Sequence, residues 1–499
     1  MPRASETIDD ATPLEGSRID VGARIGWLLR THRTVAGLSL RQMSASLGEV
    51  GVRASAATLS RIEGEGNATS SLLDGYTTVL GLPTGQLWTA AAMLRRSFSY
   101  APPATDDTVR DLDSYSAACD AVMGEAPTGG DWLIFARHHA TPAGFGLPYS
   151  LVTPLVRRLA QECARGSRTA RAVRQEALSL LMKGPYRDHL ASALMELVDE
   201  PDNQSFFLLT GVLGDVPTPE VVHWAGRRLS GATRFHVWGG SYVLQGLLVG
   251  GGVTLETWME VVPAVEAGWR AAGDDADRAA ALRELCATLP LAVQAQLPTD
   301  VWAAPTSPRA TVRWDRAADN DHYTFARRIA REVTSRLDQP AEPMLERLVF
   351  EGCFEPRGTR LSMACWLTSL SAFAHTTAEV VLERLRSAPD AESRAAALRL
   401  AVFCHDGRSV PGQDRLLADA TPAELPQVLT LLGRSGATLP EEALRRGLAG
   451  DATAVRQTLF CLGMAGDPRL ATLADDPAQP DDVRRGARWW LRAGPRIVD

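Results

Sequence analysis

Apolar residues recur every three or four positions through residues 20–97, the spacing of one face of an amphipathic helix. They define five short helices, with inward positions at Ile25, Leu28, Leu29 and His32; Met43 and Leu47; Leu59 and Ile62; Leu72, Leu73, Tyr76 and Leu80; and Leu87, Trp88 and Met93. Ser39 and Ser55 are suitable N-caps for the second and third helices. The pattern therefore predicts a compact five-helix domain.

The remainder of the chain has almost no strict alternation of apolar and polar residues, so strands are not expected there. Amphipathic stretches typical of helices are separated by short polar turns, which predicts an all-α protein. We divide the chain into a disordered tail (1–19), the five-helix domain (20–97), a linker (98–131) and a helical region (132–499). The run AAPTSPRA marks a sub-boundary near 303–310.

A loose repeat runs through the helical region. An arginine is followed three residues later by a small or apolar residue at Arg174, Arg278, Arg360, Arg394, Arg456 and Arg484. The last four are separated by 34, 62 and 28 residues, near multiples of one helical pair. The pattern resembles degenerate HEAT or armadillo-like repeats. In that family such an arginine ties one repeat to the next, and helix pairs stack into a solenoid.

The charge is unevenly distributed along the 499 residues. The whole chain has a net charge of −7, but residues 18–100 hold nine arginines against five acidic residues, a net charge of +4. Residues 101–499 have a net charge of −8. A polyanion is therefore expected to meet the five-helix domain and to avoid the rest.

Several other classes of function find no support in the sequence. The seven cysteines are scattered without a C-x-x-C pair, and no histidines stand at metal-ligand spacing, so neither a metal site nor a cofactor is expected. No apolar run is long enough for a membrane span, and the polar N-terminus lacks the core of a signal peptide. We expect a cytoplasmic, nucleoid-associated protein that is not an enzyme.

The sequence LSLRQMSASLG…SAATLSRIEGEG resembles the lambda-repressor/Cro (xenobiotic-response-element) family of helix-turn-helix regulators. The matching residues are Ser39, Met43, Ser44 and Gly48, the run Leu59–Gly64, and Leu80–Leu82. The resemblance implies that the second helix braces the third, which enters the major groove of double-stranded DNA. It also implies that Arg33 pairs with Glu63 and is thereby directed towards a phosphate.

The third helix has the composition that a groove requires, since its outward positions are small or polar. The residues expected to contact DNA are Arg33, Arg41, Gln42, Arg53, Ser55, Ala56, Ala57, Thr58, Ser60 and Arg61. Two features depart from the family pattern. Leu40 replaces the usual glutamine, and the run EVGVR lengthens the turn between the second and third helices. Ala56 and Ala57 occupy positions that often hold side chains in contact with the bases. Arg61 is therefore the main candidate for recognising guanine.

Tryptophans concentrate in the middle of the helical region. They indicate either packing between helices or an aromatic effector pocket, for which the candidates are Trp224, Trp238, Tyr242, Trp258 and Trp269. The effector class stays open between a peptide, a small molecule and a protein.

These patterns predict a DNA-binding transcriptional regulator that dimerises through its helical region and senses an effector there. Two alternatives remain: a scaffold that binds another protein while tethered to DNA, and a helical-repeat DNA glycosylase. The glycosylase requires a basic groove, which the net charge of −8 disfavours.

Overall fold

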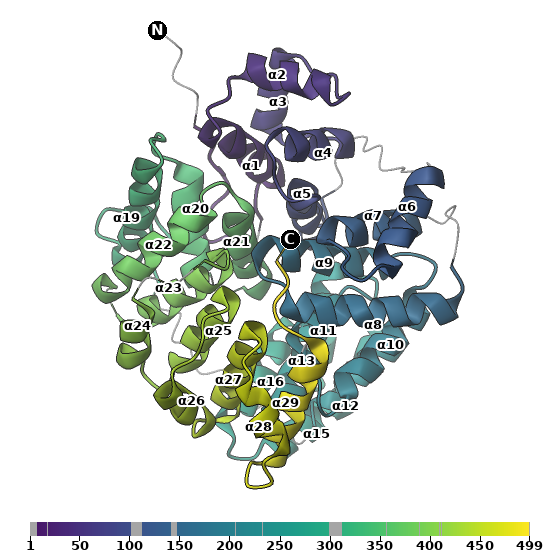
Figure 1. Cartoon of the computed structure of the whole chain (residues 1–499). Coiled ribbons are helices and arrows are strands. Elements are labelled where there is room, and N and C mark those ends of the chain that lie inside the picture. The colour runs from purple at the N-terminus through teal and green to yellow at the C-terminus, as the bar shows by residue number, and fades with distance from the viewer. Residues whose placement is uncertain are drawn as a thin grey trace.

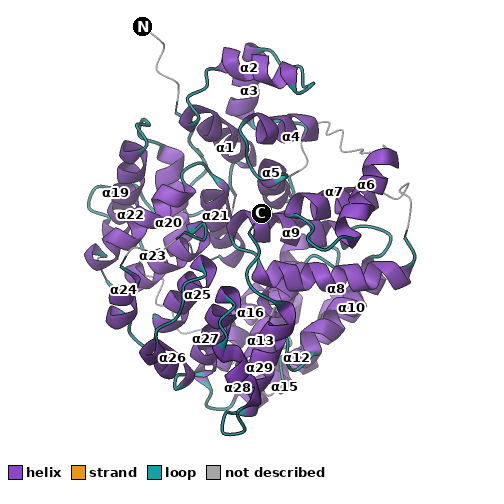
Figure 2. Cartoon of the chain, viewed as in Figure 1, coloured by secondary structure: helices purple, strands orange, loops and turns teal. Residues whose placement is uncertain are grey.

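A computed structural model describes residues 7–16, 18–100, 112–140, 147–204, 206–231, 233–298, 312–355, 357–388, 390–408, 410 and 412–498. Within these residues the regular structure is helical, without a β-strand, and the predicted all-α class is confirmed (Figure 2). The predicted sub-boundary at 303–310 lies outside the described residues. No described helix is long and apolar enough to cross a membrane.

Five helices form the N-terminal part of the structure, which we call the head. They are α1 (Val21–Val35), α2 (Leu40–Glu49), α3 (Ala56–Glu65), α4 (Ser70–Val79) and α5 (Gln86–Ser97). Their number and order match the five helices predicted from the sequence. Ser39 and Ser55 are the N-caps of α2 and α3, as expected from their hydroxyl side chains.

The rest of the chain forms two groups of helices, which we call the first and second arms (Figure 1). The first arm comprises α6 (Leu112–Met123), α7 (Gly129–His139), α8 (Tyr149–Arg165), α9 (Arg168–Leu181), α10 (Arg187–Asp199), α11 (Phe206–Leu213), α12 (Pro219–Arg228), α13 (Arg234–Gly250), α14 (Leu255–Met259), α15 (Val262–Ala272), α16 (Ala276–Thr288) and α17 (Leu291–Gln294). The second comprises α19 (Asp321–Arg336), α20 (Pro343–Phe354), α21 (Gly358–Leu370), α22 (Ala374–Arg384), α23 (Ala391–Cys404), α24 (Gln413–Asp419), α25 (Leu425–Ser435), α26 (Glu441–Leu448), α27 (Ala452–Ala465), α28 (Arg469–Asp475) and α29 (Asp481–Ala493).

Arginines join successive helices within the arms. The guanidinium of Arg399 on α23 donates to the carbonyl of Cys353 near the end of α20, and Arg434 on α25 donates to Val402 near the end of α23. Such contacts satisfy carbonyls that have no acceptor role inside their own helix. Of the arginines in the sequence repeat, Arg174 and Arg394 make comparable ties, to Pro127 and Glu424, whereas Arg484 bonds within its own helix.

The two arms meet again at the C-terminus. The amide of Ile497 donates to the carbonyl of Arg165 at 3.0 Å, and Arg456 on α27 donates to the carbonyl of Asn203 at 3.0 Å. Arg234 on α13 adds an ion pair with Asp451 at 2.9 Å. The two arms therefore contact each other along a seam, and the helices do not form an open solenoid.

The head shares its apolar core with the second arm. One continuous cluster runs from Trp27 and Leu28 of α1 to Phe350 and Phe373, while most of the first arm has a core of its own. The ring of Trp27 lies 6.0 Å from that of Phe373. Figure 1 shows α1 and α5 between the arms and the protruding helices α2 and α3.

The expected disordered tail and free linker need correction. Within the tail, Asp10 is fully buried and pairs with Arg24 of α1 and Arg347 of α20. Within the linker, residues 112–123 form α6, which packs on α7. Sequence patterns could not reveal the Asp10 contacts, because Arg347 lies more than 300 residues away, whereas α6 and α7 are neighbours in sequence.

Candidate nucleic-acid interface

Helix α2 begins at a reciprocal cap. The amide of Gln42 donates to the Ser39 hydroxyl, and the Ser39 amide donates to Oε1 of Gln42 at 2.9 Å. Met43 and Leu47 are completely buried, whereas Arg41 and Gln42 are exposed. The side-chain oxygen of Gln42 is thus occupied, and only its amide nitrogen is open to a DNA backbone.

The turn from α2 to α3 is as long as the sequence predicts, covering residues 50–55. Gly51 has a φ of +81°, a conformation that favours glycine. The hydroxyl of Ser44 donates to the Ala54 carbonyl at 2.6 Å, and the Val52 amide donates to the Leu47 carbonyl at 2.8 Å. These bonds fix the turn against α2 and leave Arg53 exposed on it.

Helix α3 has one buried and one open face. The Ser55 hydroxyl accepts a hydrogen bond from the Thr58 amide, and Leu59 and Ile62 are buried in the head. The residues predicted to contact DNA lie on the opposite side, where Ser55, Ala57, Ser60 and Arg61 are exposed and Ala56 and Thr58 are half-buried. The structure therefore brings together the whole set proposed for α3.

Glycines let α1 and α3 approach each other closely. A Cβ atom on Gly26 would lie 2.2 Å from the Glu63 carbonyl oxygen, and one on Gly66 would lie 2.0 Å from the Gly22 carbonyl oxygen. Gly66 also has a φ of +71° and ends α3. Any larger residue at these positions would push the outward face of α3 away from the rest of the head.

The predicted pair of Arg33 and Glu63 is present. Nε and Nη2 of Arg33 each donate to one carboxylate oxygen of Glu63 at 2.6 Å, and the Tyr76 hydroxyl donates to the same group at 2.9 Å. Nη1 of Arg33 donates to the Leu38 carbonyl. Because Arg33 is only 7 % exposed, its donors serve α3 and the turn before α2. We therefore assign Arg33 a structural role and remove it from the residues proposed to touch phosphate.

The net charge of +4 on the head does not become a strongly basic surface. Arg24 and Arg30 are paired with the buried carboxylates of Glu351 and Glu342, and Arg96 is paired with Glu176 of α9. The exposed arginines of the head are Arg18, Arg41, Arg53 and Arg61. The exposed carboxylates of Asp20, Glu49 and Glu65 oppose them. The head therefore exposes few cations that could meet a phosphate group.

Polar contacts between the head and the arms were missed by sequence reasoning. The Trp27 indole and the Arg30 guanidinium both donate to Glu342, and His32 and Gln86 both donate to the carbonyl of Leu370. The one signal in the sequence is that α1 carries arginines between its apolar positions, which looks like an ordinary solvated face. These contacts hold the head against the second arm.

The five aromatic residues of the candidate effector pocket have different surroundings. The Trp224 indole donates to Asp199, Trp258 is buried in the first arm, and Trp238 packs edge-on against Phe235. Trp269 lies beneath Arg283, and Tyr242 is exposed. Two surface hollows, one beside Trp314 and Arg316 and one beside Arg394 and Glu424, contain none of the five.

No protein-family model matches the chain, and no curated protein is significantly similar to it.

Proposed function

We propose that this protein is a transcriptional regulator that binds double-stranded DNA with α3 in the major groove. The observation that carries the proposal is the shape of α3. Leu59 and Ile62 anchor it, while small side chains and one arginine, Arg61, form its open face. A helix with so little bulk on one side fits a groove about 12 Å wide.

The resemblance of residues 39–64 to the lambda-repressor/Cro family supports the same reading. In this arrangement α2 crosses the phosphate backbone, with Arg41 in its first turn, and Arg61 reaches the base edges. Arg61 would donate two hydrogen bonds to O6 and N7 of a guanine. The alanines at positions 56 and 57 offer only methyl contacts, so part of the selectivity would come from DNA shape.

The small number of exposed arginines favours a homodimer. One head holds too few cations to bind tightly, whereas two heads on adjacent half-sites would combine their contacts. Because the head is fixed to the arms through Arg24 and Arg30, the separation of the two heads would be set by the dimer as a rigid body. The half-site spacing would therefore be narrow and would not tolerate insertions of a few base pairs.

The arms would act as the sensor of an effector. Helix α5 of the head and α9 of the first arm are joined by the Arg96–Glu176 ion pair and by a hydrogen bond from Thr169 to Gln86. Any ligand that shifts α9 would thus act directly on the head. An effector controls DNA binding only if it binds one conformation of the protein more tightly than another. A ligand that shifts α9 would meet this requirement.

Selection of duplexes from a random pool by the full-length protein tests the proposal. The affinity of the selected duplex is then compared with that of a scrambled one for the wild type and three variants. Arg61→Ala should lose about 1–3 kcal/mol for the selected duplex only. Arg41→Ala should weaken both duplexes equally, and Arg187→Ala on α10 should change neither. An unselective wild type would reject the proposed function, and an unchanged selectivity ratio in Arg61→Ala would reject α3 as the reading helix.

A further inference from the structure

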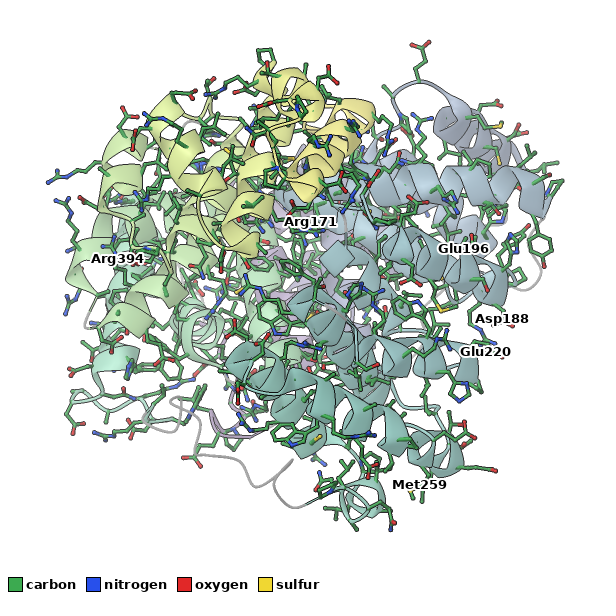
Figure 3. All side chains as sticks on the ribbon, turned by 90° about the horizontal axis from the view of Figure 1, so that it is seen from below. Arg171, Asp188, Glu196, Glu220, Met259 and Arg394 are labelled. Atoms are coloured by element: carbon green, nitrogen blue, oxygen red, sulfur yellow. The ribbon has the colours of Figure 1, made fainter. Side chains whose placement is uncertain are left out.

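The first turn of α9 lies where the two arms and the C-terminal segment converge. Ile497 is bonded to Arg165, just before α9, and Arg496 donates to the carbonyls of Gly407, Arg434 and Ser435 in the second arm. Arg171 lies in this turn. Figure 3 places it at the centre of the molecule, between the C-terminal helices of the second arm and the helices α8–α10.

Arg171 is half-buried and forms no ion pair with a carboxylate of the described residues. Its guanidinium lies 5.7 Å from the centre of the Trp366 ring, and its Nε atom is buried without a hydrogen-bond acceptor. Within the described residues no carboxylate or carbonyl accepts from its terminal nitrogens. Burial lowers the pKa of Arg171. The buried arginines Arg24 and Arg174, by contrast, face the carboxylates of Glu351 and Glu162.

A second arginine lies against the other ring of the same aromatic pair. The Trp366 ring packs edge-on against Phe403 at 5.2 Å, and the Arg434 guanidinium lies 5.7 Å from the Phe403 ring. Arg434 is 5 % exposed and donates to the neutral carbonyl of Val402. Burial and the charge of Arg171 both lower the pKa of Arg434. Two cations therefore lie against Trp366 and Phe403, and no carboxylate of the described residues pairs with either.

One carboxylate of the second arm, that of Asp406, contacts other cations. Asp406 lies 4.0 Å from Arg168, 3.2 Å from Arg408 and 3.3 Å from His375. No ion pair joins it to Arg171 or Arg434. Enclosing the Nε atom of Arg171 without an acceptor is costly, and an anion that bonded to the guanidinium would offset that cost.

We propose that Arg171 and Arg434, on the aromatic platform of Trp366 and Phe403, form a binding site for a small oxyanion. The guanidinium fork of Arg171 would donate to two oxygens of a phosphate or carboxylate group. Arg434 would contribute the second positive charge from the opposite arm. The occupied site would join the arms across the seam.

The site offers a route to the head, and this step rests on the proposed regulatory function. Arg171 shares α9 with Thr169 and Glu176, the two residues that hold α5. An anion drawing Arg171 towards the second arm would shift the helix that supports the head. The oxyanion would therefore be an effector, or part of one.

Thermal unfolding of the full-length protein tests the site, with inorganic phosphate and acetate as probes at constant ionic strength. We expect a saturable rise in the unfolding midpoint with at least one anion and none with chloride. The anion that gives it distinguishes a phosphate ligand from a carboxylate ligand. A response that does not saturate with either anion would overturn the proposal.

The variants make the assignment specific. Arg171→Gln should weaken anion binding at least about tenfold, since two charge-assisted bonds are lost, and Arg171→Lys should restore part of it. Arg187→Gln is the matched control, because Arg187 bonds to its neighbour Asp188. This variant should bind the anion as the wild type does. Wild-type affinity in Arg171→Gln would overturn the proposal.

The two proposals fail separately. Anion binding by a protein that selects no duplex would retain the site and reject the regulator. Duplex selection without anion binding would do the opposite.

Discussion

Asp10 and Arg24 form an ion pair of 2.8 Å in which neither side chain is exposed. The carboxylate of Asp10 also lies 3.2 Å from Arg347, and Arg24 pairs in turn with Glu351. A residue near the N-terminus thus completes the contact between α1 and α20. Burial raises the pKa of Asp10, but the two arginines and the Thr12 hydroxyl outweigh it and leave that pKa lowered.

Asp10→Asn should destabilise the protein by about 3–5 kcal/mol, because it leaves Arg24 and Arg347 with one carboxylate fewer in a buried site. Denaturant unfolding of the full-length protein measures the change. The matched control is Asp9→Asn. Asp9 pairs with Arg316 at the surface, so its loss should cost no more than about 1 kcal/mol. Equal effects for the two variants would show that the buried network adds no special stability.

Helix periodicity predicted the parts of the fold that depend on local sequence. The five head helices and the serine caps at positions 39 and 55 follow from residues a few positions apart. Asp10 meeting Arg347, and Ile497 meeting Arg165, depend on pairs more than 300 residues apart, for which one sequence contains no signal. The net charge of +4 on residues 18–100 overstated the basic surface of the head for the same reason. The carboxylates of Glu351 and Glu342, which neutralise Arg24 and Arg30, belong to the second arm.

The contact between α1 and α3 gives a second prediction. Gly26→Ala should destabilise the protein by about 1–3 kcal/mol, since the added methyl group meets the Glu63 carbonyl and must push the helices apart. Gly64→Ala is the matched control, because an added Cβ there meets nothing within 4 Å. The control should be neutral or stabilised by up to about 1 kcal/mol through better helix propensity. Thermal unfolding measures both, and a neutral Gly26→Ala would contradict the close packing.

Three buried histidines predict a loss of stability in mild acid. Burial lowers the pKa of His32, His139 and His405 to about 4, whereas an unfolded histidine has a pKa of about 6.5. The unfolded chain therefore binds more protons than the folded protein below pH 6.5. Above pH 6.5 none of the three histidines lowers the free energy of unfolding. As the pH approaches 4, each of them lowers it by up to about 3 kcal/mol.

His139→Phe isolates this effect. The free energy of unfolding of the variant should fall less steeply than that of the wild type between pH 6.5 and 4. The difference between the two proteins is the readout, because burial raises the pKa of Glu176 and Glu342, which act in the opposite direction. Parallel curves would show that His139 is protonated in the folded protein.

The last prediction concerns salt, and it follows from how few cations the head exposes. Every phosphate neutralised by an arginine lowers the slope of log K against log salt concentration by about 0.9. Arg18, Arg41, Arg53 and Arg61 are the exposed arginines of one head, so a single engaged head gives a slope no steeper than about −4. Two heads of a homodimer give a slope no steeper than about −7, and Arg41→Ala should reduce its magnitude by about 2.

Light scattering supplies the independent measurement of oligomeric state on the same preparation. A monomer with a slope of about −4 or shallower on a single half-site would reject the dimer and leave one head acting alone. A slope well beyond −7 would require cations from the arms to touch the duplex. Because the arms are acidic overall, that result would move the interface away from α2 and α3 and reject the proposed docking of α3 itself.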